Sequence, residues 1–271
     1  MQELLKKIYP YNQDRLVDEI LNLYERQKFV VSNFIYFSII KQQKLFESTK
    51  KTTIQKEYKK ALLKWDFLLP DGIALQIFYY LASKQFDLPV KKLSNLNWTD
   101  FVPYFLNEIK KRFWSNRIQI YLYWSKSEIV EATKQRLEYK WFNVVFTHDG
   151  YSDLDWNQIP DNWDENTLKI MLVARSTPTN PIQELRTQKN YSKIKENNLI
   201  VFTVWWLFDF IAAEWTQKKK WTQKRAPKLV RQIKLEWLWR LVTDPKRNYI
   251  KVKNSFALFP YIFKYLVLKK Q

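Results

Sequence analysis

The sequence predicts an α/β fold: a Rossmann-like, mostly parallel sheet flanked by helices, with a basic helical appendage at the C-terminal end. Three observations predict it. Short runs rich in β-branched and aromatic residues alternate with amphipathic stretches, the positive charge is concentrated near the C-terminus, and 271 residues suffice to bury a large core. Such alternation is typical of βαβ units. We therefore expect an α/β catalytic core at residues 1–213 and a basic amphipathic appendage at residues 214–271.

Six runs of 4–7 residues have the character of buried strands. They are Phe29–Ile35, Asp66–Leu69, Arg117–Tyr123, Phe142–Thr147, Leu168–Ala174 and Leu199–Val204. Helical periodicity marks stretches between them, among them Thr52–Leu63, Ile73–Ser83, Asp100–Arg112 and Ser125–Glu138. Because ligands bind at the carboxyl ends of parallel strands, polar residues that directly follow a strand are the candidates for a site.

The appendage carries most of the net charge. Residues 214–271 contain 16 Lys and Arg against three acidic residues, a net charge of +13 out of +19 for the chain. A helix is expected over Lys228–Val242, and the aromatic stretch Asn254–Leu268 is too short to span a bilayer but suits an interfacial anchor. Packing of this stretch on the core or on a partner chain remains an alternative. The charge indicates phosphate or anionic lipid as a partner, with nucleic acid as the rival.

Composition excludes several classes of protein. The absence of cysteine excludes disulfides and thiolate metal sites, and His148 is the only histidine. No signal peptide and no apolar run of transmembrane length is visible, so we expect a cytoplasmic protein. Asp153-Leu154-Asp155 invites comparison with a divalent-cation signature, but we expect neither a metal nor another cofactor.

Several polar residues follow the predicted strands. Asp71, in Pro70-Asp71-Gly72, closes one strand and precedes a helix, where a carboxylate can deprotonate an attacking hydroxyl. The same tripeptide is also simply a good turn. Asn33 ends the first strand, and its amide suits a sugar hydroxyl or a diphosphate oxygen as well as a plain structural role. Gln183 and Glu184 open a helix whose free N–H groups suit phosphate or sugar oxygens.

Other candidates open helices or lie in the appendage. Asp100 begins a helix, where an N-cap and a substrate contact are equally good explanations. Asp209 follows the last strand and suits either a helix cap or hydrogen bonds to ribose or uracil. Arg225, Arg240 and Arg247 bring guanidinium groups, which bind phosphate bidentately and stay charged at any relevant pH.

These motifs together resemble the WecG/TagA/CpsF glycosyltransferases (glycosyltransferase family 26) over most of the chain. The resemblance rests on Pro70-Asp71-Gly72, Asn97–Asp100, Pro181–Glu184, Phe208-Asp209, Arg225-Ala226-Pro227, Leu235–Leu241 and Asp244–Arg247. It departs from the family at Asn95, where the family has a basic residue, and at Val31, at the place of a family threonine.

The resemblance implies an inverting, metal-independent transferase. It would move N-acetylmannosamine or a related hexosamine from a UDP-sugar to a polyprenyl-diphosphate-linked sugar, for a cell-surface polysaccharide or teichoic acid. Asp71 would be the catalytic base. The residues that would bind substrate or nucleotide are Asn33, Asp100, Gln183, Glu184, Asp209, Arg225, Arg240 and Arg247. It further implies peripheral association with the inner face of an anionic membrane and leaves room for a homo-oligomer.

Glycine is scarce and tryptophan abundant. The chain has 2 glycines and 13 tryptophans, whereas average usage would give roughly 19 glycines. Trp98, Trp124, Trp205 and Trp206 stand where the family pattern has glycine. We hypothesise that many of these tryptophans are UGA codons that the source organism translates as glycine. Genuine tryptophan in a divergent homologue is the alternative, and UGG codons at these positions would establish it.

Two other readings of the chain remain. A basic nucleic-acid-binding module would stack bases on the aromatic residues of the appendage. The α/β alternation and the ordered motifs argue against this module, so we expect no nucleic acid partner. A family member that has lost catalysis would keep the fold without turnover, and the missing glycines leave this second alternative open.

Overall fold

The computed structural model describes most of the chain. The described residues are 1–47, 51–123, 125–149, 154–159, 167–174, 181–216 and 258–268, with the single residues 230, 238, 239 and 242. Most of the predicted helix Lys228–Val242 therefore lies outside them, as do Trp124, Asp153, Arg225, Arg240 and Arg247.

The described strands form one parallel sheet of six, in the order β2-β1-β6-β5-β3-β4, which confirms the predicted α/β fold. Their bounds are β1 Val30–Tyr36, β2 Phe67–Asp71, β3 Ile118–Tyr123, β4 Asn143–His148, β5 Leu168–Ala174 and β6 Leu199–Trp205. Each predicted strand matches one of them to within two residues at either end. β6, the last in sequence, lies between β1 and β5 and joins the two halves of the sheet.

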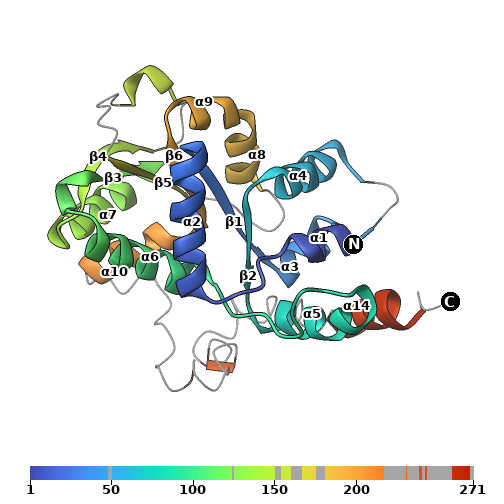
Figure 1. The fold of residues 1–271 in the computed structure, drawn as a ribbon. Coiled ribbons are helices and arrows are strands. Elements are labelled where there is room, and N and C mark those ends of the chain that lie inside the picture. Colours follow the sequence, from blue (N-terminus) through green and yellow to red (C-terminus); the bar gives the residue numbers. More distant parts are fainter. Residues whose placement is uncertain are drawn as a thin grey trace.

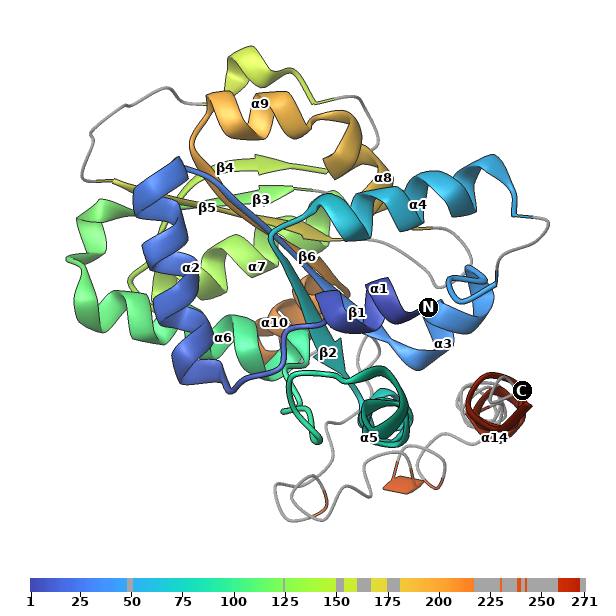
Figure 2. The ribbon, with the colours of Figure 1, turned by 45° about the vertical axis from the view of Figure 1, so that its right-hand side comes forward.

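Helices cover both faces of the sheet (Figures 1 and 2). Those on one face are α2 Gln13–Gln27, α6 Trp98–Arg112, α7 Ser127–Tyr139 and α10 Leu207–Thr216, and they pack around one large apolar cluster. Those on the other face are α4 Thr53–Lys64, α8 Ile182–Lys189 and α9 Tyr191–Glu196. Local sequence starts two of these helices: Asn12 caps α2, and Thr52 and Gln55 form a reciprocal capping box on α4.

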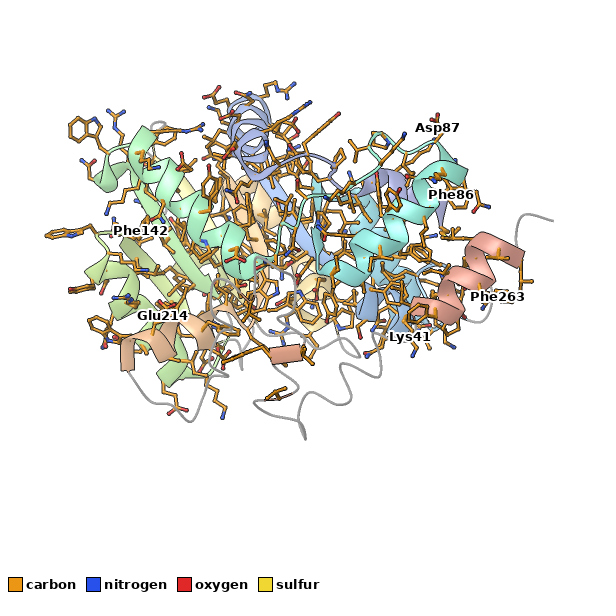
Figure 3. The ribbon with its side chains drawn as sticks, turned by 90° about the horizontal axis from the view of Figure 1, so that it is seen from below. Lys41, Phe86, Asp87, Phe142, Glu214 and Phe263 are labelled. Carbon is orange, nitrogen blue, oxygen red and sulfur yellow. The ribbon has the colours of Figure 1, made fainter. Side chains whose placement is uncertain are left out.

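A third apolar cluster extends the core past edge strand β2. It contains α1 Gln2–Lys7, α3 Phe37–Gln42, α5 Ile73–Phe86 and the C-terminal helical segment, residues 258–268, made of α14 Leu258–Ile262 and the π-helical turn Phe263–Val267. α5 and the C-terminal segment lie side by side in the views of Figures 2 and 3. Phe46 stacks on Phe78 of α5, with ring centroids 5.2 Å apart, and also meets Tyr265 edge-on at 5.9 Å. The aromatic tail thus packs on the core through one side.

No helix in the described part of the chain is long and apolar enough to cross a membrane.

Candidate functional site

Asp71 lies at the carboxyl end of β2, beside the last residue of β1. The register of the two strands pairs Tyr36 with Asp71. Gly72 then turns the chain into α5 with a φ of 87°, a conformation that favours glycine. The N–H of Gly72 donates to Oδ1 of Asn95 at 2.9 Å. Asn95 therefore holds the turn that follows Asp71. In the family pattern a basic residue stands at this position. The Asp71 side chain is only partly buried.

Asn33 lies inside the sheet, which corrects our expectation that it ends the first strand. β1 continues for three residues, to Tyr36, because Phe34 and Ile35 still find apolar neighbours on the two faces. The Asn33 side chain is fully buried, and its Oδ1 accepts a hydrogen bond from the Thr203 hydroxyl of β6. A ligand can reach this amide only if the site opens to that depth.

Gln183 and Glu184 lie in the first turn of α8, as predicted, and both are fully buried. Gln183 Nε2 donates to Glu184 Oε1 at 3.0 Å. Gln183 Oε1 accepts the backbone N–H of Trp205 at 3.2 Å. The start of α8 is therefore joined to the end of β6.

Two tyrosines complete this polar cluster. Burial, and then the charges of Glu184 and Asp71, raise the pKa of Tyr36 well above its usual value. Burial, and then Glu184 and Tyr36, raise the pKa of Tyr58 of α4 similarly, while the nearby Asn33 amide opposes the shift. Both phenols are therefore neutral at physiological pH. The sequence did not identify Tyr36 and Tyr58 as site residues, because hydrophobic periodicity indicates only that they are buried aromatic residues.

The structure thus brings four predicted residues together around the carboxyl ends of β1, β2 and β6. Asn33, Asp71, Gln183 and Glu184 are linked by strand pairing, hydrogen bonds or electrostatic interaction through Tyr36 and Tyr58. We call Asn33, Tyr36, Tyr58, Asp71, Gln183, Glu184 and Thr203 the edge cluster.

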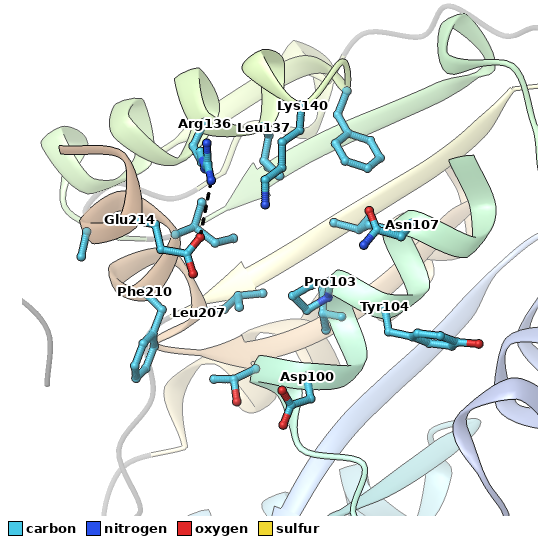
Figure 4. Close-up of a pocket in the computed structure, with 16 residues that line it drawn as sticks. Asp100, Pro103, Tyr104, Asn107, Arg136, Leu137, Lys140, Leu207, Phe210 and Glu214 are labelled. Atoms are coloured by element: carbon cyan, nitrogen blue, oxygen red, sulfur yellow. Dashed lines mark ion pairs between the residues drawn. The ribbon is translucent and has the colours of Figure 1, made fainter. Parts of the chain in front are cut away.

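Asp100 lies in the first turn of α6, in the helical layer opposite α4 and α8. It lines a groove of about 500 Å³ between α6, α7 and α10, which Figure 4 shows. Arg136 and Glu214 form an ion pair of 3.9 Å along one wall of the groove. Asp100 does not cap α6, which corrects one of our two explanations. Asn97 is the N-cap, and its Oδ1 accepts the backbone N–H of Asp100 at 3.0 Å.

Asp209 lies in the first turn of α10, partly buried, directly after the end of β6. The starts of α6 and α10 approach each other through Trp98 and Phe210, whose ring centroids are 5.5 Å apart. Asp100 and Asp209 thus occupy helix starts on the α6 and α10 side, whereas the amides of the edge cluster lie on the α4 and α8 side. The three tail arginines, Arg225, Arg240 and Arg247, lie outside the described residues.

No group of three or more His, Cys, Asp or Glu side chains with metal-binding geometry occurs within the described residues. Asp155 has a local role, since its side chain accepts the N–H of Asn157 at 3.0 Å and caps a 3-10 turn. The His148 ring packs against Tyr123 and Phe146, with centroids 5.5 and 6.3 Å away.

Two tryptophans adopt a backbone conformation that favours glycine. Trp205 has a φ of 51° and Trp141 a φ of 64°. Trp141 follows the end of α7, where the Phe142 N–H bonds to the Leu137 carbonyl as in a glycine-type helix end. Trp98 and Trp206 do not have positive φ. The positive φ of Trp205 and Trp141 therefore supports the hypothesis that these codons are translated as glycine. The backbone at Trp98 and Trp206 gives no such support.

The chain is similar to a known protein family. The model of the glycosyl transferase WecG/TagA/CpsF family covers residues 7–271, nearly the whole chain. The match includes Asp71, the edge cluster and the appendage.

Proposed function

The chain belongs to the WecG/TagA/CpsF family of glycosyltransferases, and we propose that it transfers N-acetylmannosamine or a related hexosamine from a UDP-sugar to a polyprenyl-diphosphate-linked sugar. The product would enter a cell-surface polysaccharide or teichoic acid. The observation that carries the proposal is the position of Asp71, a partly exposed carboxylate at the carboxyl edge of a parallel sheet, beside buried amide and acidic side chains.

In this proposal Asp71 is the catalytic base. Its carboxylate accepts the proton of the acceptor hydroxyl while the hydroxyl oxygen attacks the anomeric carbon of the donor. The bond between that carbon and the β-phosphate oxygen breaks, and UDP leaves with the electron pair. The Gly72–Asn95 hydrogen bond holds the carboxylate at the strand end, so the base is positioned before substrate arrives.

The donor would bind across the edge cluster. Gln183 supplies an amide and Asn33 a second one for sugar hydroxyls, while Asp209 would accept hydrogen bonds from ribose or uracil. Arg225, Arg240 and Arg247 would stabilise the charge that develops on the leaving diphosphate. Because these cations can supply that stabilisation, we propose a reaction without a metal cofactor.

We further propose that α5 and the C-terminal segment place the enzyme on a membrane. Of the large apolar side chains that the structure exposes, seven lie on these two neighbouring helices: Ile77, Tyr80, Leu81, Phe259, Phe263, Val267 and Leu268. Phe259, Phe263 and Val267 are spaced four residues apart, so they share one side of the segment. Lys84 and Lys264, both exposed, add positive charge beside this surface.

The proposed surface adjoins the proposed base. α5 starts two residues after Asp71, so a bilayer under α5 would bring the diphosphate of a lipid-linked acceptor close to that carboxylate. The acceptor's polyprenyl chain could then stay in the bilayer during transfer.

UDP release tests the reaction. The assay would use UDP-N-acetylmannosamine with a short lipid-diphosphate-N-acetylglucosamine acceptor, for the chain as written, for a version with glycine at positions 98, 124, 205 and 206, and for Asp71→Asn in each. We expect release that needs the acceptor and that Asp71→Asn abolishes. Acceptor-dependent release that survives Asp71→Asn would reject Asp71 as the base, and no release with any hexosamine donor would reject the proposed reaction.

Vesicle sedimentation tests the membrane surface. Phe259→Ser with Phe263→Ser should lower binding to vesicles of phosphatidylglycerol and phosphatidylethanolamine. The matched control is Tyr139→Ser with Trp141→Ser, because these aromatics are 66% and 76% exposed but lie near Phe142, at the opposite end of the molecule from Phe263 in Figure 3. Equal losses for both pairs would reject the proposed surface.

A further inference from the structure

Trp205 combines burial with a backbone conformation that tryptophan rarely adopts. Six non-glycine residues in the described part of the chain have positive φ, and Trp205 is the only buried one among them, at 5% exposure. A side chain with a Cβ is strained in this region, because the Cβ approaches the carbonyl oxygen that follows it. A β-bulge with β5 lies at the same point, where the register shifts before Ala174 pairs with Trp205. The backbone at the end of β6 therefore favours glycine over tryptophan.

The indole lies within the edge cluster. The Trp205 ring meets the Tyr36 ring edge-on, with centroids 5.1 Å apart. The backbone N–H of Trp205 donates to Gln183 Oε1. The indole Nε1 is buried and has no hydrogen-bond partner among the described residues. A buried donor without a partner is unusual in a native interior.

Trp205 also lies beside buried polar groups. Asn33, Gln183 and Glu184 are each fully buried, although the proposed function gives them contacts with the donor. Thr203, which bonds to Asn33, lies two residues before Trp205 on the same strand. An aromatic side chain buries roughly 150–250 Å² of surface, so the indole occupies space comparable with that of a bound base or sugar ring.

We propose that residue 205 controls entry of the nucleoside diphosphate sugar, and that the Trp205 indole closes the part of the site between Tyr36 and Gln183. The proposal rests on the proposed function and adds a specificity-determining residue to it. A glycine at position 205 relaxes the backbone, removes the indole and makes the amides of Gln183 and Asn33 accessible to the donor. If a UDP-sugar is the natural donor, the chain as written is the closed form, and a UGA codon translated as glycine would give the open form.

Trp141 supplies a matched control. It has a similar positive φ but is 76% exposed, and it lies after α7 at the far end of the sheet from the edge cluster. Trp141→Gly therefore relieves the same kind of backbone strain without opening the site. Any effect of Trp205→Gly that Trp141→Gly reproduces comes from the backbone and not from the space that the indole leaves.

The test is the affinity for UDP, measured by isothermal titration calorimetry on the full chain, on Trp205→Gly and on Trp141→Gly. We expect Trp205→Gly to bind UDP at least about tenfold more tightly than the other two, since even one methylene of pocket space is worth about tenfold. Free indole should bind to Trp205→Gly and compete with UDP, because both use the vacated space. Equal UDP affinity for the full chain and Trp205→Gly, or indole binding that leaves UDP binding unchanged, would overturn the proposal.

Failure of the proposed function gives a different result. If Trp205→Gly binds indole but none of the three proteins binds UDP, the nucleotide donor is wrong and so is the role of position 205 in admitting it. If the full chain binds UDP as tightly as Trp205→Gly does and Asp71→Asn abolishes turnover, the function stands while the closed-site proposal fails. Trp205→Asn is the second variant should the glycine variant not fold, because asparagine tolerates positive φ. It should also bind UDP more tightly than the full chain, and an unchanged affinity would count against the proposal.

Discussion

β1 and β6 lie side by side in the middle of the sheet, and their two faces differ in character. On one face Phe34 and Phe202 pack with Phe101 and Phe105 of α6, with ring centroids 5.0–6.4 Å apart. On the other face, one residue away along each strand, Asn33 bonds to Thr203.

The comparison separates the residues that stabilise the fold from those that the reaction would use. Apolar burial on the α6 face stabilises the protein. The polar groups of the α4 and α8 face lose hydration free energy on burial, and hydrogen bonds must compensate for this loss. We therefore expect substitutions on the first face to lower stability and substitutions around the second face to change the chemistry. Four predictions, in decreasing order of expected effect, test this division.

The largest effect is expected at Asp71. Asp71→Asn should lower turnover by about 10²- to 10⁴-fold, because it removes a general base, and should leave the melting temperature nearly unchanged. Asp66→Asn is the matched control at the other end of β2, where the carboxylate accepts the Val31 N–H at 2.8 Å and Gln27 Nε2 at 3.1 Å. It should lower stability by about 1–3 kcal/mol and leave the turnover of folded protein unchanged. The reverse pattern in calorimetry and kinetics would exchange the roles of the two aspartates.

Phe202 tests the apolar face. Phe202→Ala should lower the free energy of unfolding by about 3–5 kcal/mol, because it leaves a cavity between β6 and α6. Phe202→Leu keeps most of the volume and should cost less than Phe202→Ala. Urea unfolding at pH 7 measures both. A loss below about 1 kcal/mol for Phe202→Ala would mean that this face does not form the main core.

Thr203 tests the polar face at the neighbouring position. Thr203→Val preserves the shape but removes the hydroxyl that donates to the buried Asn33 Oδ1, so we expect a loss of about 1–3 kcal/mol. The same variant should also raise the KM for the UDP-sugar, because Asn33 is a proposed donor contact. If only stability changes, the polar pair has a structural role and does not belong to the donor site.

The smallest effect is a change in the alkaline pH dependence at Tyr58. Its pKa in the folded protein is raised, so folding favours the neutral phenol, and this stabilisation is fully present below about pH 10 and is lost as the pH rises above it. Tyr58→Phe should reduce the loss of stability by up to about 1.4 kcal/mol per pH unit above pH 10. Urea unfolding at pH 9 and pH 11 measures the difference. An identical decline in both proteins would show that Tyr58 does not contribute to it.

Local sequence predicted the strands because each carries its own signal. β5, Leu168–Ala174, was predicted to the residue, since a mostly apolar run bounded by polar residues indicates both ends. The place of Asn33 within β1 was predicted less well. Asn33 interrupts an apolar run, and the sequence could not show that Thr203 lies opposite to satisfy its amide inside the sheet.

The candidate site was predicted in part for the same reason. Asp71, Gln183 and Glu184 lie at a strand end or a helix start, which short-range patterns reveal. Tyr58 joins them only because α4 packs over the sheet beside α8. Asp100 has an equally good local pattern, but α6 lies on the opposite face of the sheet, where Asp100 lines a groove with α7 and α10.

The sequence by itself determined the alternation of strands and helices, the position of Asp71 at a strand end and the concentration of positive charge in the appendage. These properties depend on periodicity, turn residues and composition, which are local. Only the tertiary structure decided that β6 pairs between β1 and β5, that Trp205 reaches Tyr36 and Gln183, and that the C-terminal segment lies beside α5. Parallel pairing joins residues about 170 positions apart, such as Asn33 and Thr203, and no local pattern encodes which distant strands will meet.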